Sequence, residues 1–196
     1  MLGRVVSTMI VLAHGAACTG EQPPAGDSGR DSTGGAPGNT LGDALYTLPH
    51  LPTGEPDTVR LANGEYVHRY DESAATVRRV SLSEFVARGE LDGNPGEDAA
   101  VVLIDQPGGS GTFYYLAALV RRGEGWESVT AVLLGDRIRI ESLSIDSEDR
   151  EVSVTFLTRA EGVAMATEPT VRQTRHYRAV AGSLVQVDGG DISPDE

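Results

Sequence analysis

Two nearly uninterrupted apolar runs, residues 99–104 and 113–120, constrain the fold of this chain more than any other part of its sequence. Runs of this length, rich in aliphatic and aromatic residues, are typical of strands that are buried on both faces. The glycine-rich segment 108–112 separates them, and glycines allow the positive φ angles of a tight connection. We therefore expect a hairpin at the centre of a sheet, although the pattern over 113–122 also fits a helix.

Alternating polar and apolar residues predict strands through much of the remaining chain. The phase of the alternation changes near Glu141 and Ser142, which predicts a β-bulge. The predicted strands outside the central hairpin cover residues 66–70, 76–82, 126–134, 137–145, 151–158, 171–179 and 184–187.

One short helix is predicted between Ser81 and Gly89. Ser81 and Glu84 have the spacing of a capping box, and Gly89 is a stop signal. Taken with the strands, this predicts a mainly β (β-rich α+β) fold. We expect an antiparallel meander that is curled into a barrel or a sandwich, with this one helix.

The first 17 residues have the features of a signal peptide. Arg4 supplies a positive charge, residues 5–13 form a short apolar stretch, and small residues precede Cys18, the only cysteine. The apolar stretch is too short to span a bilayer. Because the position of Cys18 resembles that of the lipidated cysteine in bacterial lipoproteins, we expect acyl chains on it. A simple secretory signal is the alternative.

Composition divides the rest of the chain into three parts. Residues 18–40 contain the lipidated cysteine and a linker of Gly, Pro, Ser, Asp and Thr, which cannot bury enough apolar surface to become ordered. Residues 41–187 are expected to form a single β-rich globular domain, and residues 188–196 an acidic disordered tail. Lipid chains on Cys18 would attach an otherwise soluble domain stably to a membrane.

An acidic segment leads into the first apolar run. Its oxygen-bearing residues Glu90, Asp92, Asn94 and Asp98 fall at positions 1, 3, 5 and 9, and side chains at this spacing can converge on one calcium ion. Pro95 stands at the sixth position, where the sharp turn favours glycine. Two interpretations stay open, namely a weak or structural calcium site and a solvated acidic turn.

Four segments of the chain resemble successive motifs of a family of uncharacterised bacterial lipoproteins. The family has an acidic DLDGDG-type loop followed by DAAV, then GGSGTFYYLAA and LGDR motifs. Here the segments are LDGNPGEDAAVVL, GGSGTFYYLAAL, LLGDRIRIESLSI and EGVAMATEPTV, and the resemblance covers roughly residues 62–179. It implies a fold and a place in the cell envelope, and it puts Glu90, Asp92, Asn94 and Asp98 in the acidic loop. Asn94-Pro95 stands where the family has Asp-Gly.

The charge of the chain excludes one class of partner. The formal net charge is −13, with 29 acidic residues, and all 16 basic residues are arginine. Such a chain is repelled by nucleic acid and by anionic lipid head groups. The expected partners are therefore the membrane, reached through the N-terminal lipid, and an unknown envelope protein or glycan.

Catalytic patterns are weak in this sequence. His50, His68 and His176 lack the spacing of a zinc-binding pair. A hydrolase would require His176 to meet Ser110 and an aspartate. Asp136 and Arg137 are predicted to form a turn with a surface salt bridge, with a ligand-binding arginine as the alternative.

The sequence thus predicts a non-catalytic, lipid-anchored lipoprotein of the cell envelope that serves as a binding or interaction module. We expect it on the periplasmic or the outer-membrane and extracellular face. The alternatives are a calcium-stabilised structural domain and, third, an envelope hydrolase. No catalytic residue is assigned, and calcium is the only cofactor considered.

Overall fold

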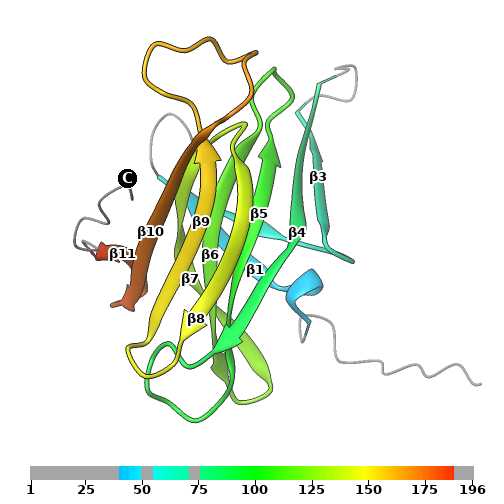
Figure 1. The fold of residues 1–196 in the computed structure, drawn as a ribbon. Helices are drawn as coiled ribbons and strands as arrows, with labels where there is room; N and C mark the ends of the chain where they lie inside the picture. Colours follow the sequence, from blue (N-terminus) through cyan, green and yellow to red (C-terminus); the bar gives the residue numbers. More distant parts are fainter. Residues whose placement is uncertain (1–39, 50–54, 71–75, 188–196) are drawn as a thin grey trace, which may run out of the picture. The chain divides into compact units, whose positions relative to one another are not determined.

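The described part of the chain is almost entirely β-structure. A computed structural model describes residues 40–49, 55–70 and 76–187 (Figure 1). The predicted signal peptide, Cys18, His50, most of the predicted linker and the predicted tail lie outside these residues. The elements are η1 (Leu41–Asp43), β1 (Leu45–Pro49), β2 (Pro56–Arg60), β3 (Glu65–Arg69), β4 (Val77–Gly89), β5 (Asp98–Gln106), β6 (Phe113–Arg122), β7 (Gly125–Asp136), β8 (Arg139–Asp146), β9 (Glu151–Thr158), β10 (Val171–Val180) and β11 (Ser183–Val187).

The strands form one large sheet and one small one. The large sheet has nine strands in the order β3-β4-β5-β6-β7-β11-β10-β9-β8, and β1 pairs with β2 in a separate hairpin. The large sheet curls into a half-barrel, which confirms the predicted fold class. The expected antiparallel meander holds within β3–β7 and within β8–β11. It is wrong at the junction, where β11 joins β7 in parallel through the single pair Ser183↔Thr130.

The predicted central hairpin is confirmed. β5 and β6 pair antiparallel from Ala99↔Leu119 to Asp105↔Phe113, so the alternative helix over residues 113–122 is wrong. Both faces of these two strands are buried, each in a different apolar core, as the unbroken hydrophobic runs indicated.

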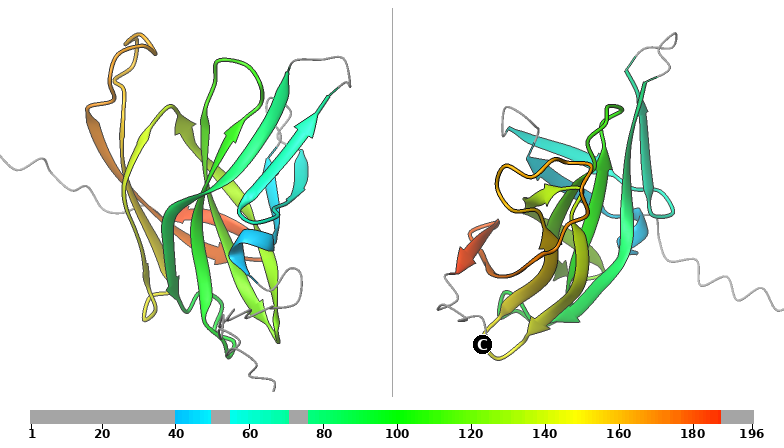
Figure 2. Two further views of the ribbon diagram at one scale, coloured as in Figure 1. Left: turned by 90° about the vertical axis from the view of Figure 1, so that its right-hand side faces the viewer. Right: turned by 45° about the horizontal axis from the view of Figure 1, so that its top comes forward.

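The inner core lies between the two meanders. It holds alternate residues of β5 and β6, such as Val102 and Leu116, packed against Val154 and Phe156 of β9 and Tyr177 of β10. The left view of Figure 2 shows β8 and β9, in yellow, on one side of the green strands and the cyan elements on the other. At the seam between β4 and β8 a Cβ atom on Gly89 would lie 2.6 Å from Ile145, so close approach there requires glycine.

The outer core is covered by the β1–β2 hairpin and η1. Tyr46 and Leu48 of β1 and Val59 of β2 pack on the face of the sheet that carries Val101 and Leu119. The sequence predicts no strand over residues 45–60, because the stretch is short and interrupted by prolines that favour turn or edge positions.

The predicted short helix is wrong, since residues 81–89 belong to β4. Ser83 and Phe85 are partly buried and Glu84 and Val86 are exposed, which is the two-residue period of a strand. A register shift between Leu82 and Val86 bulges the strand, and the Ser83 hydroxyl accepts a hydrogen bond from the Phe85 N–H at 3.1 Å. The predicted capping residues Ser81 and Glu84 therefore lie in a bulged strand, because pairing with β5 decides the backbone conformation.

The other predicted bulge is confirmed. The pairing of β8 with β9 shifts between Ile140 and Ser142, which leaves Glu141 as the extra residue. The ranges of the last three strands also agree with the alternation, and β9 covers residues 151–158 as predicted.

A buried ion-pair cluster ties the small hairpin to the large sheet. The Arg78 guanidinium of β4 donates from Nη2 to Asp105 Oδ2 of β5 at 2.7 Å and from Nε to Asp105 Oδ1 at 3.1 Å. It also bonds to Asp57 of β2. The side chains of Arg78 and Asp105 are only 11% and 6% exposed. Burial acts to lower the pKa of Arg78, but hydrogen bonds to Asp105 and Asp57 outweigh it, so the pKa is raised.

Candidate functional site: the acidic loop and the groove beside it

The acidic loop connects β4 to β5 and gathers the predicted oxygen ligands. Carboxylate oxygens of Glu90, Asp92 and Asp98 all lie within 4.8 Å of one another. The Asn94 amide donates to Asp92 Oδ2 at 2.9 Å, which joins the fourth predicted residue to the cluster. The spacing in the sequence therefore identified residues that do meet in space.

Backbone N–H groups occupy several of these carboxylate oxygens. Glu90 Oε1 accepts from the N–H groups of Asp92, at 2.9 Å, and of Gly93. Buried Asp98 accepts from the Leu91 N–H at 2.8 Å and from the Arg121 N–H at 2.7 Å. The carboxylates thus fold the loop onto the first strand of the central hairpin, as in Asx turns.

One arginine neutralises part of the cluster. Arg122, at the end of β6, donates from Nη1 to Asp92 Oδ2 at 2.5 Å and lies 2.9 Å from Glu127 Oε2. Burial acts to raise the pKa of Asp92, but hydrogen bonds from Asn94 and Arg122 outweigh it and lower the pKa. Burial also raises the pKa of Asp98, and its own N–H donors only partly oppose the shift, to which the nearby charges of Asp92 and Glu90 add.

The loop fits a calcium ion only in part. Calcium takes about six to eight oxygen ligands, and three carboxylates within 4.8 Å could supply some of them. Asp98, however, already accepts one N–H on each oxygen, and Asp92 Oδ2 already accepts from the Arg122 guanidinium and from the Asn94 amide. The arrangement therefore agrees at least as well with a self-contained acidic turn, the second interpretation of the sequence.

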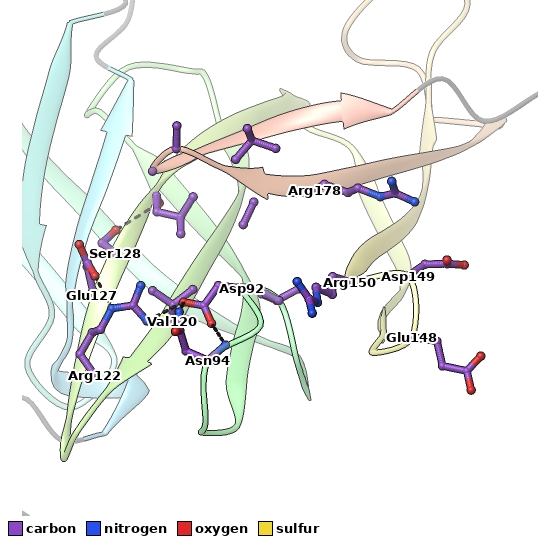
Figure 3. A pocket seen from close by; sticks show the side chains of 16 residues that line it. Asp92, Asn94, Val120, Arg122, Glu127, Ser128, Glu148, Asp149, Arg150 and Arg178 are labelled. Atoms are coloured by element: carbon purple, nitrogen blue, oxygen red, sulfur yellow. Dashed lines mark hydrogen bonds and ion pairs between the residues drawn. The ribbon is translucent and has the colours of Figure 1, made fainter.

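A groove of about 700 Å³ opens beside the loop (Figure 3). Its walls are the acidic loop, the first half of β7, the β8–β9 turn at residues 148–150 and the segment 178–182, where β10 turns into β11. Its floor is apolar, with Leu91, Val120 and Val129. The volume falls within the range of about 300–1,000 Å³ that is usual for ligand pockets.

Charges of both signs surround the groove. Four carboxylates and three guanidiniums line it, and Figure 3 shows Arg150 pointing toward Asp92. Nη1 of Arg150 lies 2.7 Å from the position of a Cβ atom on Gly93, and Gly93 has a φ of 82°, which favours glycine at that position. In the described part of the chain no ion pair of Arg150 is found. The lining residues are Leu91, Asp92, Asn94, Val120, Arg122, Glu127, Ser128, Val129, Glu148, Asp149, Arg150, Arg178, Ala179, Val180, Ala181 and Gly182.

The sequence did not predict this groove. Its walls come from four separate segments, and nothing in the spacing of Arg150 or Arg178 connects them with Asp92.

His176 contacts a different serine from the one considered in the sequence. Its Nδ1 lies 2.8 Å from Ser153 Oγ and 2.7 Å from Glu151 Oε1, all on the paired strands β9 and β10. A catalytic relay needs the acid and the nucleophile on different ring nitrogens, whereas these two share one. Ser110 lies exposed in the β5–β6 connection.

The structure places Asp136 and Arg137 at the corner between β7 and β8. Asp136 Oδ1 accepts the Thr112 N–H at 2.8 Å and lies 3.5 Å from Arg137 Nε. Arg137 has a φ of 51°. This agrees with the expected turn and salt bridge.

Comparisons with known proteins found no related protein. No protein-family model, no curated protein and no solved structure matches the chain. Within residues 40–49, 55–70 and 76–187, no helix is long and apolar enough to cross a bilayer. The fold and the groove define a β-rich half-barrel with a charged depression at one end.

Proposed function

We propose that this chain is a non-catalytic, lipid-anchored binding module of the cell envelope and that the groove beside the acidic loop is its binding surface. The observation that carries the proposal is the groove itself, which combines an apolar floor with a rim of both charge signs. Sites of this composition hold a ligand by burying its apolar parts and orienting its polar ones.

The groups in the groove suit binding. Arg122 is held by Asp92 and Glu127, while Arg150 on the opposite wall has no ion pair within the described residues and is available to a ligand. The hydroxyl of Ser128 accepts the Thr47 N–H at 3.0 Å, so it is engaged in the fold.

Attachment to the membrane rests on Cys18, which lies outside the described residues. Replacing Cys18 by alanine removes the proposed site of acylation. We expect Cys18→Ala to move the protein from the membrane fraction to the soluble fraction on cell fractionation, because the acyl chains supply the hydrophobic anchorage. Continued membrane association of the variant would contradict lipidation at this residue.

The groove can be tested in cells by photo-crosslinking. With a photoreactive amino acid at Glu148, on the rim of the groove, we expect a discrete adduct with an envelope component. The matched control is the same amino acid at Glu161, which is also exposed but does not line the groove. Equal adducts at both positions, or none at Glu148, would contradict binding at the groove.

The second candidate function is a calcium-stabilised structural domain, which the convergence of Glu90, Asp92 and Asp98 favours. A site with affinity on the order of a millimolar adds roughly 1 kcal/mol when calcium is several times its Kd, or about 3 °C in Tm. On this alternative, calcium raises the Tm of the wild type and of Glu97→Ala, and Asp92→Ala abolishes the rise. An unchanged Tm of the wild type would identify the loop as an acidic turn.

A further inference from the structure

We propose that a second, apolar pocket, between β4 and β8 at one end of the inner core, binds the acyl chain of a zwitterionic lipid. The pocket has a volume of about 390 Å³, within the usual range of about 300–1,000 Å³ for ligand sites. It shares no lining residue with the groove beside the acidic loop. The two sites are separate, so the two proposals can fail independently.

The pocket continues the inner core. On the inner face of the central hairpin, Val102 and Leu116 are fully buried. Ile104 and Tyr114, two residues further along, pair with each other and lie on the same face, but they are only partly buried and line the pocket. The last filled layer of the core is therefore followed by an apolar layer with space in it.

Bulges in two strands form the pocket. β4 is bulged over residues 83–85, which line the pocket, and β8 is bulged at Glu141, next to the lining residue Ile140. Bulges bend strands and are frequent beside binding and active sites. Farther along the same seam a Cβ atom on Gly89 would lie 2.6 Å from Ile145, so there β4 and β8 approach closely. The seam is thus closed at one end and holds the pocket at the other.

The walls of the pocket suit a hydrocarbon chain. The hydroxyl of Ser83 already accepts the Phe85 N–H at 3.1 Å, so it is engaged in the bulge. A peptide in the pocket would bring N–H and C=O groups against apolar walls, where unpaired polar groups are costly. An acyl chain has no such groups, and its burial is favourable. The apolar walls consist of Phe85, Ile104, Tyr114, Ile138 and Ile140.

The rim of the pocket indicates the kind of lipid head. Glu84 and Arg139 are exposed lining residues, and neither forms an ion pair within residues 40–49, 55–70 and 76–187. They offer one negative and one positive group, which complement the ammonium and the phosphate of a zwitterionic head. A head with a net negative charge is disfavoured, because the chain itself carries a net charge of −13.

The test uses the full chain and phosphatidylcholine vesicles in which a small fraction of the lipid carries a photoreactive diazirine in its acyl chain. After illumination, mass spectrometry of the peptides locates the adducts. We expect adducts at Phe85, Ile104 and Tyr114, and none at Val185, which is apolar and 47% exposed but lies outside the pocket. Adducts at Val185 as frequent as those in the pocket, or none in the pocket, would overturn the proposal. This map needs no variant, so it decides even if a substituted chain fails to fold.

A larger side chain at Ile104 should fill the pocket. We expect Ile104→Trp to lower the number of adducts at Phe85 and Tyr114 about tenfold, because the acyl chain loses contacts equivalent to at least one large apolar side chain. Val185→Trp is the matched control, since it adds the same side chain outside the pocket and should change nothing. Undiminished adducts in a folded Ile104→Trp variant would show that the chain binds elsewhere.

The charge of the head is tested in otherwise identical vesicles with photoreactive phosphatidylglycerol. We expect fewer adducts in the pocket than with phosphatidylcholine. Arg139→Gln should weaken the capture of phosphatidylcholine about threefold, as the loss of one partly exposed ion pair predicts. Arg88→Gln, also exposed but outside the pocket, should leave it unchanged. Equal capture of both lipids by the wild type would contradict a zwitterionic occupant.

Discussion

Arg78→Ala is expected to lower the free energy of unfolding by about 3–5 kcal/mol, the range for removing one partner of a buried ion pair. The variant leaves the Asp105 carboxylate, only 6% exposed, without its bidentate partner. It also breaks the link to Asp57, which attaches the β1–β2 hairpin to the large sheet. Urea unfolding followed by circular dichroism measures the change.

The neighbouring arginine provides the control. Arg79 pairs with Glu65, but these side chains are 47% and 43% exposed, so Arg79→Ala should cost less than about 1 kcal/mol. Replacing both Arg78 and Asp105 by leucine should cost less than Arg78→Ala alone, because no buried charge then loses its principal partner. Equal effects of Arg78→Ala and Arg79→Ala would show that the buried cluster is not a structural tie.

Asp98→Ala is expected to cost about 2–4 kcal/mol at neutral pH, since it leaves two N–H groups without their charged acceptor. These donors belong to Leu91, at 2.8 Å, and to Arg121, at 2.7 Å, and Asp98 itself is 1% exposed. Glu97→Ala, one residue earlier and exposed, should change the stability by less than about 0.5 kcal/mol.

The dependence of this effect on pH has a defined sign. Because burial raises the pKa of Asp98 above the usual 3.8, its titration adds stability that is fully present below pH 3.8. That contribution is lost as the pH rises through the folded-state pKa. The unfolding free energy of the wild type minus that of Asp98→Asn should therefore increase as the pH falls toward 3.8. A difference that shrinks over this range would contradict a raised pKa.

Local patterns in the sequence predicted those strands whose environment is uniform along their length. β5 and β6 are buried on both faces, and β9 alternates regularly, so the sequence alone indicated their positions. For the segment 81–89 the local pattern predicted a helix, because Ser81 and Glu84 match a helix cap, whereas the ladder with β5 and the bulge at Ser83 and Phe85 decide its conformation. The parallel β7–β11 contact had no local signal, since it joins residues far apart in the chain.

In the candidate site, too, the sequence predicted the local part and not the part that is built from distant segments. The spacing of Glu90, Asp92, Asn94 and Asp98 pointed to one short loop, in which the carboxylates of Glu90, Asp92 and Asp98 do lie close together, whereas metal binding there stays a prediction. The groove could not be predicted, since its walls come together only when the curled sheet brings the β8–β9 turn and the end of β10 beside the loop.

The single residue pair between β7 and β11 also has a consequence for the order of folding. Within each meander, neighbouring strands follow one another in the chain, so their loops close at low entropic cost. The contact between Thr130 and Ser183 instead closes a long loop for very few hydrogen bonds. We expect the two meanders to form first and to dock late, so that the edge of β7 is among the last parts of the sheet to acquire its neighbour.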